Sequence, residues 1–277
     1  MNVYTTEKIR NIVLLGHGGS GKTSLAEAMA YLGGITSRMG KVTDGNTVSD
    51  YGKEEQKRHF SISASCIAIE WDGCKINLLD TPGYFDFVGE VEEAVSAADA
   101  AIIVVSGKAG MEVGALKAWE LCEKYHLPRM VYVSDMDVDQ ASYKEVVEDL
   151  TQLYGKKIAP FHFPIRENEK FVGYVNVVSE TGYRWIGKEV EECEIPDYSR
   201  PYLEKYRESL MEAVAETSEE MMDRYFAGEV FSDAEIRAAL RNNVVDGSIV
   251  PVSMGSNILC QGVYTLLDDC LLYTSPS

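Results

Sequence analysis

The sequence is poor in positive charge for its length. It carries 26 Lys and Arg against 44 Asp and Glu in 277 residues, which gives a formal net charge of −18. Contacts with nucleic-acid phosphates need Lys and Arg, so a chain this acidic is a poor candidate for holding RNA through its own field. For the same reason we expect no direct binding to DNA.

Paired cysteines and long apolar runs are also missing. The six cysteines include no C-x-x-C pair and no His-rich region accompanies them, which predicts reduced thiols and excludes a disulfide framework. No apolar run approaches the ~18 residues that a membrane span needs. No signal-peptide pattern precedes the first expected strand. We therefore expect a cytoplasmic protein without a membrane contact.

What is present is a strand that leads directly into a glycine-rich loop. Residues 12–15 are apolar, the motif G-x-x-x-x-G-K-T follows, and residues 24–30 favour a helix. Glycine lets backbone N–H groups close around a phosphate chain. Lys22 would reach the β- and γ-phosphates, and the Thr23 hydroxyl would bind Mg²⁺. The residues predicted to hold a nucleotide here are Gly16, His17, Gly18, Gly19, Ser20, Gly21, Lys22, Thr23 and Ser24.

A second motif, Asp80-Thr81-Pro82-Gly83, ends the strand expected at residues 75–79. An acidic residue at a strand end beside a phosphate loop can hold Mg²⁺, usually through water. The backbone N–H of Gly83 would be free to face a γ-phosphate, so this turn can sense whether that phosphate is there. D-x-x-G alone is a common turn. One strand after the phosphate loop, it indicates a switch GTPase rather than a nucleotide kinase.

With these motifs in place, the chain resembles the GTP-binding domain of translational GTPases, and elongation factor G most closely. Residues 40–62 follow that family's first switch without a gap, and residues 80–92 follow its second switch. Gly255-Ser256-Asn257 stands where the family has Gly-Ser-Ala. The likeness runs over essentially the whole chain. It implies GTP and GDP as ligands, Mg²⁺ as the metal, hydrolysis of GTP to GDP, and the ribosome as a partner of the full-length factor.

The resemblance also assigns roles. Ser61 stands in for the switch Thr, and its hydroxyl can contact Mg²⁺ and the γ-phosphate. The metal ligands are then expected to be Thr23, Ser61 and Asp80. The groups expected to act in catalysis are Lys22, Ser61, Gly83 and Tyr84. The guanine base is expected to meet Ser134, Asp137, Ser256 and Asn257.

The base-reading loop departs from the family pattern. Ser134-Asp135-Met136-Asp137 replaces Asn-Lys-x-Asp. Asp137 is kept, and its carboxylate would accept two hydrogen bonds from the guanine edge. Ser134 loses reach, and Asp135 replaces the Lys whose stem covers the base. We expect weaker GTP affinity than in a standard member, with guanine preference surviving mainly through Asp137; the alternative is that Ser134 and Asp135 only cap a strand end.

Two further departures concern the phosphates. Tyr84 stands where the family usually carries the histidine that orients the attacking water. Tyr can still position water but stays uncharged near neutrality, and related factors with Tyr here exist. Gly19 replaces an Asp associated with a monovalent cation. These departures therefore bear on the rate of hydrolysis, whereas nucleotide binding is predicted by the phosphate loop.

The pattern of strands and helices predicts an α/β fold, a P-loop NTPase G domain with a mostly parallel sheet covered by helices on both faces. Strands at 67–71 and 76–79 should form a hairpin through Asp72-Gly73. Residues 36–61 lack periodicity, as a mobile switch would. In that segment Glu54, Glu55 and Lys57 are expected to be solvated.

From residue 156 onward the pattern changes, which predicts an inserted α+β subdomain like the one in elongation factor G. Short strands are expected at 158–165, 171–178 and 183–186, and capping boxes at Thr217 and Ser232 each predict a helix. The expected division is a G domain core at 1–156, the inserted subdomain at 157–248, and the last strand and helix of the core at 249–277. The domains that follow in elongation factor G are absent, so we expect a part of a longer factor that acts in translocation.

Two other functions stay open at this point. A nucleotide-binding regulatory or ribosome-protection module with little GTPase activity would explain Tyr84 and Ser134 as marks of lost turnover. An adenine-specific ATPase or kinase is disfavoured by Asp137 and by the match to both switches.

Overall fold

Two β-sheets organise the chain. The computed structural model describes residues 2–186 and 189–274. A seven-stranded sheet has the order β2-β3-β1-β4-β5-β11-β6, and β2 alone runs antiparallel to its neighbour. Its strands are β1 (Ile9–Gly16), β2 (Ser65–Trp71), β3 (Cys74–Asp80), β4 (Ala100–Ser106), β5 (Arg129–Ser134), β6 (Ile158–Pro160) and β11 (Val250–Met254).

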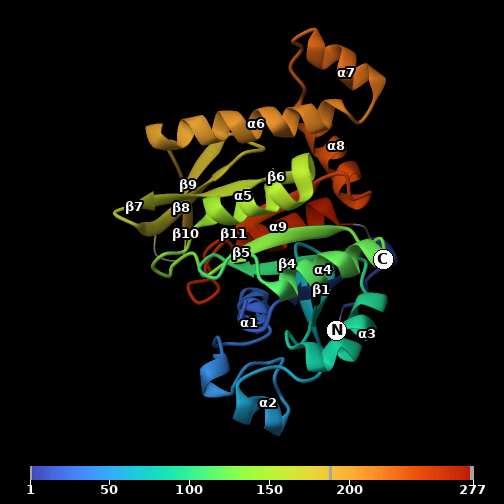
Figure 1. The fold of residues 1–277 in the computed structure, drawn as a ribbon, viewed down its shortest axis with the longest axis vertical. Coiled ribbons are helices and arrows are strands. Elements are labelled where there is room, and N and C mark those ends of the chain that lie inside the picture. The colour runs from blue at the N-terminus through green and yellow to red at the C-terminus, as the bar shows by residue number, and fades with distance from the viewer. Residues whose placement is uncertain (1, 187–188, 275–277) are drawn as a thin grey trace.

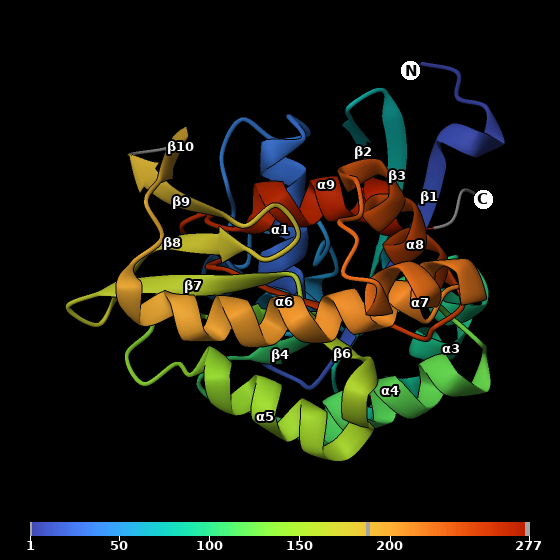
Figure 2. The same cartoon turned by 90° about the horizontal axis from the view of Figure 1, so that it is seen from above.

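Helices cover both faces of this sheet, because its central strands are apolar on both sides. Every residue of β4 and β5 is buried. Alternate strand residues enter two clusters: Ile12, Ile102 and Tyr132 pack against α1 (Lys22–Leu32) and α9 (Val263–Tyr273). On the other face lie α3 (Val88–Ser96), α4 (Val113–Lys124) and α5 (Tyr143–Tyr154). Figure 2 shows α1 and α9 on one side and α4 and α5 on the other. The predicted α/β fold is confirmed.

A smaller antiparallel sheet follows in the order β10-β9-β8-β7. Its strands are β7 (His162–Glu167), β8 (Lys170–Asn176), β9 (Thr181–Ile186) and β10 (Glu189–Cys193). The helices α6 (Arg200–Ala215), α7 (Glu219–Phe226) and α8 (Asp233–Val245) come next, before the chain returns to the large sheet in β11. In Figure 1, α7 lies at one end of the molecule and α2 (Lys53–Arg58) at the other.

The strand predicted at residues 158–165 is divided between the two sheets. Residues 158–160 pair in parallel with β11, whereas β7 pairs with β8. Phe161 joins them, because its N–H donates to the carbonyl of Val252 (3.0 Å) and its carbonyl accepts from Val177 (2.9 Å). Pro160 lacks an N–H, which suits it to the end of an edge strand.

The helices within residues 2–186 and 189–274 include none with the length and hydropathy of a membrane span.

Turn and helix-cap residues in the sequence predicted several local structures. The hairpin turn at Asp72 (φ 41°) and Gly73 (φ 71°) joins β2 to β3, with Trp71 opposite Cys74. Ser232 and Glu235 form the predicted capping box of α8. The capping box predicted at Thr217 was wrong: Ser218 is the N-cap of α7, and its hydroxyl accepts from the N–H of Met221, which has no carboxylate to complete a box.

The core beside α4 provides a test of the fold. Trp119 is 2% exposed, and its ring stacks on Tyr154 with centroids 3.6 Å apart. Trp119→Ala should lower the free energy of unfolding by about 3–5 kcal/mol in urea titrations, because it leaves a cavity between α4 and α5. Val113→Ala, on the same helix but 54% exposed, is the matched control and should change it by less than about 0.5 kcal/mol. Equal effects of the two substitutions would contradict this packing.

Candidate nucleotide-binding site

The predicted phosphate loop joins the end of β1 to the start of α1. Three of its glycines adopt positive φ, namely Gly16 (143°), Gly19 (89°) and Gly21 (92°). A Cβ on Gly16 would lie 2.4 Å from the carbonyl oxygen of Val104, whereas a Cβ on Gly19 would meet nothing within 4 Å. The loop is therefore packed against the sheet on one side and open on the other. Its open side stands at the N-terminus of α1, where backbone N–H groups favour an anion.

A cavity of about 200 Å³ borders this loop. Five lining residues come from the phosphate loop, and Ser24 follows them in α1. The first switch contributes Val42, His59, Phe60 and Ser61, and the second switch contributes Thr81, Gly83 and Tyr84. The structure thus brings three segments that are far apart in the sequence to one cavity. The lining residues from the loop are Gly18, Gly19, Gly21, Lys22 and Thr23.

Lys22 is held inside the loop. Its side chain is 6% exposed, and its ammonium donates to the carbonyl of His17 (2.7 Å) and to that of Gly16 (3.1 Å). Burial lowers the pKa of Lys22 to about 8, and the nearby charge of Asp80 acts in the opposite direction. The ammonium is therefore positioned by the backbone before any ligand arrives.

Oxygen ligands gather beside Lys22. The Oγ1 of Thr23 lies 3.0 Å from the Oγ of Ser61, within hydrogen-bond distance. Asp80 is 1% exposed, and neither of its carboxylate oxygens has a hydrogen-bond partner within the part of the chain that the structure describes. Burial raises the pKa of Asp80 to about 6, while the hydroxyls of Ser49 and Thr23 and the charge of Lys22 oppose the rise. Two hydroxyls and an unsatisfied carboxylate are the hard oxygen ligands that suit Mg²⁺.

Ser49 and Asp50 belong to this cluster, and the sequence analysis missed them. Both are buried, and burial raises the pKa of Asp50 while the hydroxyl of Ser61 opposes the rise. Asp50 also raises the pKa of Asp80. A single buried Asp in a segment without periodicity leaves no signal that separates it from a solvated one, so only the folded chain identifies it.

The first switch is held by two buried carboxylates. Glu27 accepts from the N–H groups of Gly40 and Val48, both at 2.7 Å. Glu55 accepts from Ile62 (2.9 Å) and Ser63 (3.1 Å) and is 6% exposed. The expectation of a solvated Glu55 was therefore wrong: the side chain satisfies backbone N–H groups that have no strand or helix partner. Glu54 and Lys57 are exposed, as expected.

The second switch touches the phosphate loop. A Cβ on Gly83 would lie 2.5 Å from the Nζ of Lys22 and 2.6 Å from the Cα of Gly18, so this position has room only for glycine. Tyr84 is 47% exposed, and its ring packs edge-on against Phe60 with centroids 4.8 Å apart. A Cβ on Gly18 would stand 3.3 Å from the ring of Tyr84. The two switches and the loop therefore meet at Tyr84.

The side chain of His17 turns away from the cavity. Its Nδ1 accepts from the N–H of Gly114 (3.2 Å), and its Nε2 lies 3.5 Å from the carboxylate of Glu112. Only the backbone of His17 faces Lys22, through the carbonyl that accepts from it. The imidazole ties the loop to the start of α4.

The two loops expected to read the base lie together behind the phosphate loop. The N–H of Met136 donates to the carbonyl of Gly255 (3.2 Å), which joins them. Ser134 is fully buried and donates to the carbonyl of Ser20 (2.8 Å). Asp137 is exposed. Ser256 and Asn257 are both buried.

Asp135, in the position of the family's Lys, is turned into the protein. It adopts a φ of 60° and accepts a hydrogen bond from the hydroxyl of Ser106 (2.7 Å). Burial raises its pKa, and the charge of Asp137 raises it further. Asp135 is thus engaged with β4 and does not extend as the stem of a lysine would.

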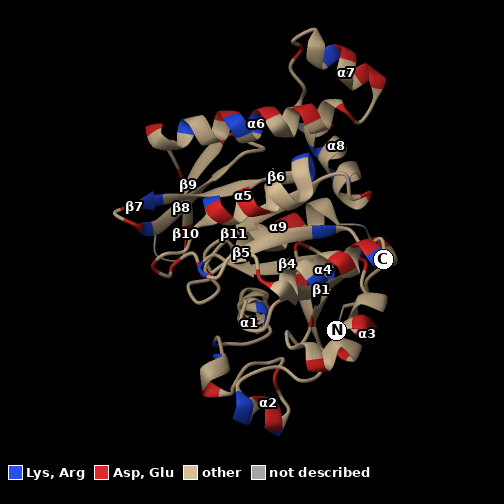
Figure 3. Cartoon of the chain, in the orientation of Figure 1, with Lys and Arg blue, Asp and Glu red and all other residues tan. Residues whose placement is uncertain are grey.

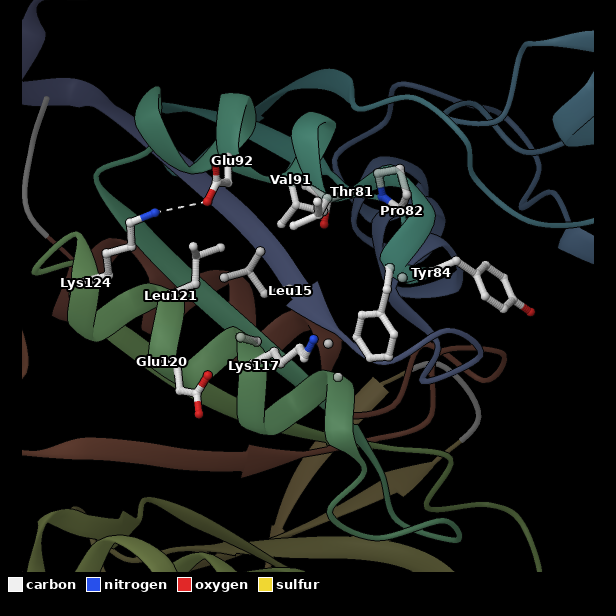
Figure 4. A pocket seen from close by; sticks show the side chains of 16 residues that line it. Leu15, Thr81, Pro82, Tyr84, Val91, Glu92, Lys117, Glu120, Leu121 and Lys124 are labelled. Atoms are coloured by element: carbon white, nitrogen blue, oxygen red, sulfur yellow. Dashed lines mark hydrogen bonds and ion pairs between the residues drawn. The ribbon is translucent and has the colours of Figure 1, made fainter.

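A second cavity, of about 280 Å³, lies between the second switch and α4 (Figure 4). Leu15, Val91 and Leu121 form its apolar walls, and the ion pair of Lys124 with Glu92 (3.0 Å) crosses it. Lys117 places its ammonium 4.3 Å from the centre of the Phe85 ring. The second switch and α4 therefore face each other across this cavity.

Comparisons with known proteins agree with this architecture. The family model described as Elongation factor Tu GTP binding domain matches residues 7–276. A crystal structure of a protein from Thermus thermophilus is 36% identical, superposes with a TM-score of 0.92 and covers 98% of this chain. The match covers 41% of the Thermus thermophilus chain, so the present chain spans less than half of that protein's length.

The buried Asp80 predicts a trade between stability and metal binding. The raised pKa of Asp80 means that its ionisation is less favourable in the folded state than in the unfolded state. Above pH 6 the ionised carboxylate therefore lowers the free energy of unfolding by about 3 kcal/mol. Asp80→Asn should therefore stabilise the ligand-free protein in urea titrations at pH 7, by up to that amount. The gain should shrink as the pH falls from 6 to 4, because the wild-type carboxylate then takes up its proton. The same substitution should weaken Mg²⁺-dependent triphosphate binding at least tenfold; a variant less stable than wild type at pH 7 would contradict the assignment.

The contact of Gly83 with the phosphate loop gives a second prediction. Gly83→Ala should force the second switch away from Lys22 and reduce the preference for triphosphate over diphosphate at least tenfold in fluorescent-nucleotide titrations. Gly89→Ala is the control, because a Cβ there meets nothing within 4 Å, and we expect it to leave nucleotide affinity unchanged. Equal nucleotide preference in both variants would show that the Gly83 contact has no role.

Proposed function

The chain belongs to the Elongation factor Tu GTP-binding domain family, whose members are GTPases, and we propose that it is the nucleotide switch of an elongation factor G-like protein. The observation that supports this most directly is the group formed by Lys22, Thr23, Ser61 and Asp80. These side chains come from the phosphate loop, the first switch and the end of β3. Lys22, Thr23 and Ser61 line one cavity, and the buried carboxylate of Asp80 is close enough to Lys22 and Thr23 for both to affect its pKa. A triphosphate with a divalent cation is the ligand that would satisfy them together.

In the proposed complex, the loop from Gly16 to Thr23 encloses the phosphates, and Ser24 lies in the first turn of α1 behind them. Thr23, Ser61 and Asp80 would hold Mg²⁺, with Asp50 beside them. The cation would neutralise negative charge on the β- and γ-phosphates. Lys22 supplies a second positive charge from the protein side. Ser61 and Gly83 would detect the γ-phosphate; this proposal is supported by their closeness to the phosphate loop, each from a different switch.

Hydrolysis requires one water molecule in line with the γ-phosphorus. Its oxygen bonds to that phosphorus as the bond to the β–γ bridging oxygen breaks, and GDP and phosphate result. We propose that Tyr84 orients this water, since its hydroxyl can donate or accept a hydrogen bond and its ring is positioned by Phe60. An uncharged phenol stabilises developing negative charge less than an imidazolium would, so a slow intrinsic rate is expected.

Guanine selectivity is proposed to depend on Asp137. The carboxylate is exposed next to a loop pair that is otherwise buried, so it is available to the base. Asp135 faces Ser106 instead of the base. We therefore expect recognition of the guanine edge without the covering stem that Lys provides, and a correspondingly weaker affinity.

The finer role concerns the full-length factor, and we propose that it acts on the ribosome in translocation. Residues 157–248, between the base-reading loop and β11, are the proposed inserted subdomain; residues 1–156 and 249–277 are the proposed core. In Figure 3, Asp and Glu are spread over α3, α4, α6 and α7, with Lys and Arg scattered among them. Binding to the ribosome would therefore rely on the switches, on protein contacts or on other domains of the factor. A regulatory or ribosome-protection module with little turnover is the second candidate, favoured by Tyr84 and Ser134.

Two measurements test the proposal. Labelled GTP bound with Mg²⁺ should be displaced by unlabelled GTP and GDP but resist excess ATP; effective displacement by ATP would end the guanine assignment. Single-turnover hydrolysis, with and without ribosomes, then separates the two candidates. Phosphate release in either condition supports the GTPase, and its absence in both supports the regulatory module.

Tyr84 gives the matching mutational prediction. Tyr84→Ala should lower the single-turnover rate at least tenfold while GDP affinity changes less than about threefold, because the side chain acts on the water and not on the diphosphate. Tyr125→Ala, on the surface at the end of α4, is the control and should leave both unchanged. A rate unaffected by Tyr84→Ala would remove Tyr84 from the reaction.

A further inference from the structure

Two buried side chains tie the base-reading loops to the phosphate loop. The hydroxyl of Ser134 donates to the carbonyl of Ser20 (2.8 Å), and the Nδ2 of Asn257 donates to the carbonyl of Gly21 (3.0 Å). Ser134 is 0% exposed and Asn257 is 2% exposed. The loss of the buried Ser134 bond would remove a side-chain donor from the carbonyl of Ser20. The carbonyl of Gly21 also accepts from the N–H of Leu25 in α1 (2.8 Å), so the amide of Asn257 is its second donor and ties the late loop to the start of that helix.

The two ties converge on one point. A Cβ built on Gly21 would lie 2.9 Å from the Nδ2 of Asn257 and 3.4 Å from the Oγ of Ser134. Gly21 has a φ of 92° and stands directly before Lys22, at the start of α1. Whatever fixes Gly21 also fixes the direction in which the phosphate loop enters that helix.

Ser134 alone cannot donate to both carbonyls. A serine hydroxyl has one hydrogen to donate, and here it goes to Ser20. An asparagine has two donor hydrogens on a longer side chain, and the family pattern has that asparagine at position 134. In this chain the amide comes from Asn257, at the position where the family's late loop has alanine. The amide is therefore present in the site, but on the loop after β11 instead of the loop after β5.

We propose that Asn257 is a positioning residue that replaces the amide lost at position 134. It fixes the late loop, and through Gly21 the phosphate loop, in the arrangement that a nucleotide requires. This inference rests on the proposed function, since the arrangement matters only if a nucleotide binds here. The Oδ1 of Asn257 is buried and has no hydrogen-bond partner among the described residues, so one acceptor is left for a donor that arrives with the ligand.

An exchange of side chains tests the proposal. Asn257→Ala should raise the Kd for GDP about tenfold, mainly through faster dissociation in stopped-flow chases with fluorescent GDP. Ser134→Asn alone should also weaken binding, because two amides then compete for the carbonyl of Gly21. The double variant Ser134→Asn/Asn257→Ala should return to within about threefold of wild type. Recovery in the double variant is the result that a merely structural role of Asn257 would not produce.

A matched control separates positioning from general destabilisation. Asn243 is a buried asparagine in α8 that donates to the carbonyl of Ala213 (3.0 Å), outside the nucleotide site. Asn243→Ala should lower the melting temperature and leave the Kd for GDP unchanged. Melting curves of all ligand-free variants establish that each one folds.

Each outcome decides the matter. Binding by Asn257→Ala within twofold of wild type would overturn the inference, and so would a loss that the double variant fails to recover. In both cases the proposed function stands, because wild-type protein binds GDP. Wild-type protein that binds no guanine nucleotide would instead overturn the proposed function, and the inference with it.

Discussion

The site depends on two opposite charges that are buried close enough to influence each other's pKa. Lys22 and Asp80 are each nearly inaccessible to water. Burial lowers the pKa of Lys22 and raises the pKa of Asp80, and both shifts favour the neutral form of the side chain. Their mutual attraction offsets part of this cost, but both oxygens of Asp80 lack a hydrogen bond among the described residues. The apolar sheet around them supplies the stability that keeps this arrangement in place. A phosphate chain with a divalent cation would satisfy both groups, so binding such a ligand would relieve the cost of burying them.

The topology of the large sheet decides where the loops meet. β1, β3, β5 and β11 run in parallel, so their C-terminal ends lie at one edge of the sheet. The phosphate loop follows β1, Asp80 ends β3, Ser134 ends β5, and Ser256 follows β11. In open α/β sheets, ligands bind in the crevice at this edge. Four segments spread over about 240 residues thereby form one site, and the small antiparallel sheet enters the chain between two of them.

The two switches are held in different ways. Buried carboxylates of Glu27 and Glu55 hold the first switch through hydrogen bonds to its backbone. The second switch touches Lys22 through Gly83 on one side and faces a cavity above α4 on the other. Glu90 of the second switch accepts from the N–H of Ala64, so the two segments are linked. A displacement of the second switch would therefore alter the hydrogen bond at Ala64, two residues after the end of the first switch.

The sequence by itself determined whatever depends on local chemistry. The motif from Gly16 to Thr23 predicted the phosphate loop because glycine lets backbone N–H groups approach a phosphate, and the Asp72-Gly73 pair predicted the hairpin turn. In the structure Gly16, Gly21 and Gly73 all adopt positive φ. Apolar runs predicted the buried strands. Only the tertiary structure decided which polar side chains meet. Glu55 reads as a solvated residue until its backbone partners are in place. The hydrogen bond between His17 and Gly114 joins residues 97 positions apart, and the bond from Asn257 to Gly21 joins residues 236 positions apart. No local sequence pattern predicts contacts over such separations.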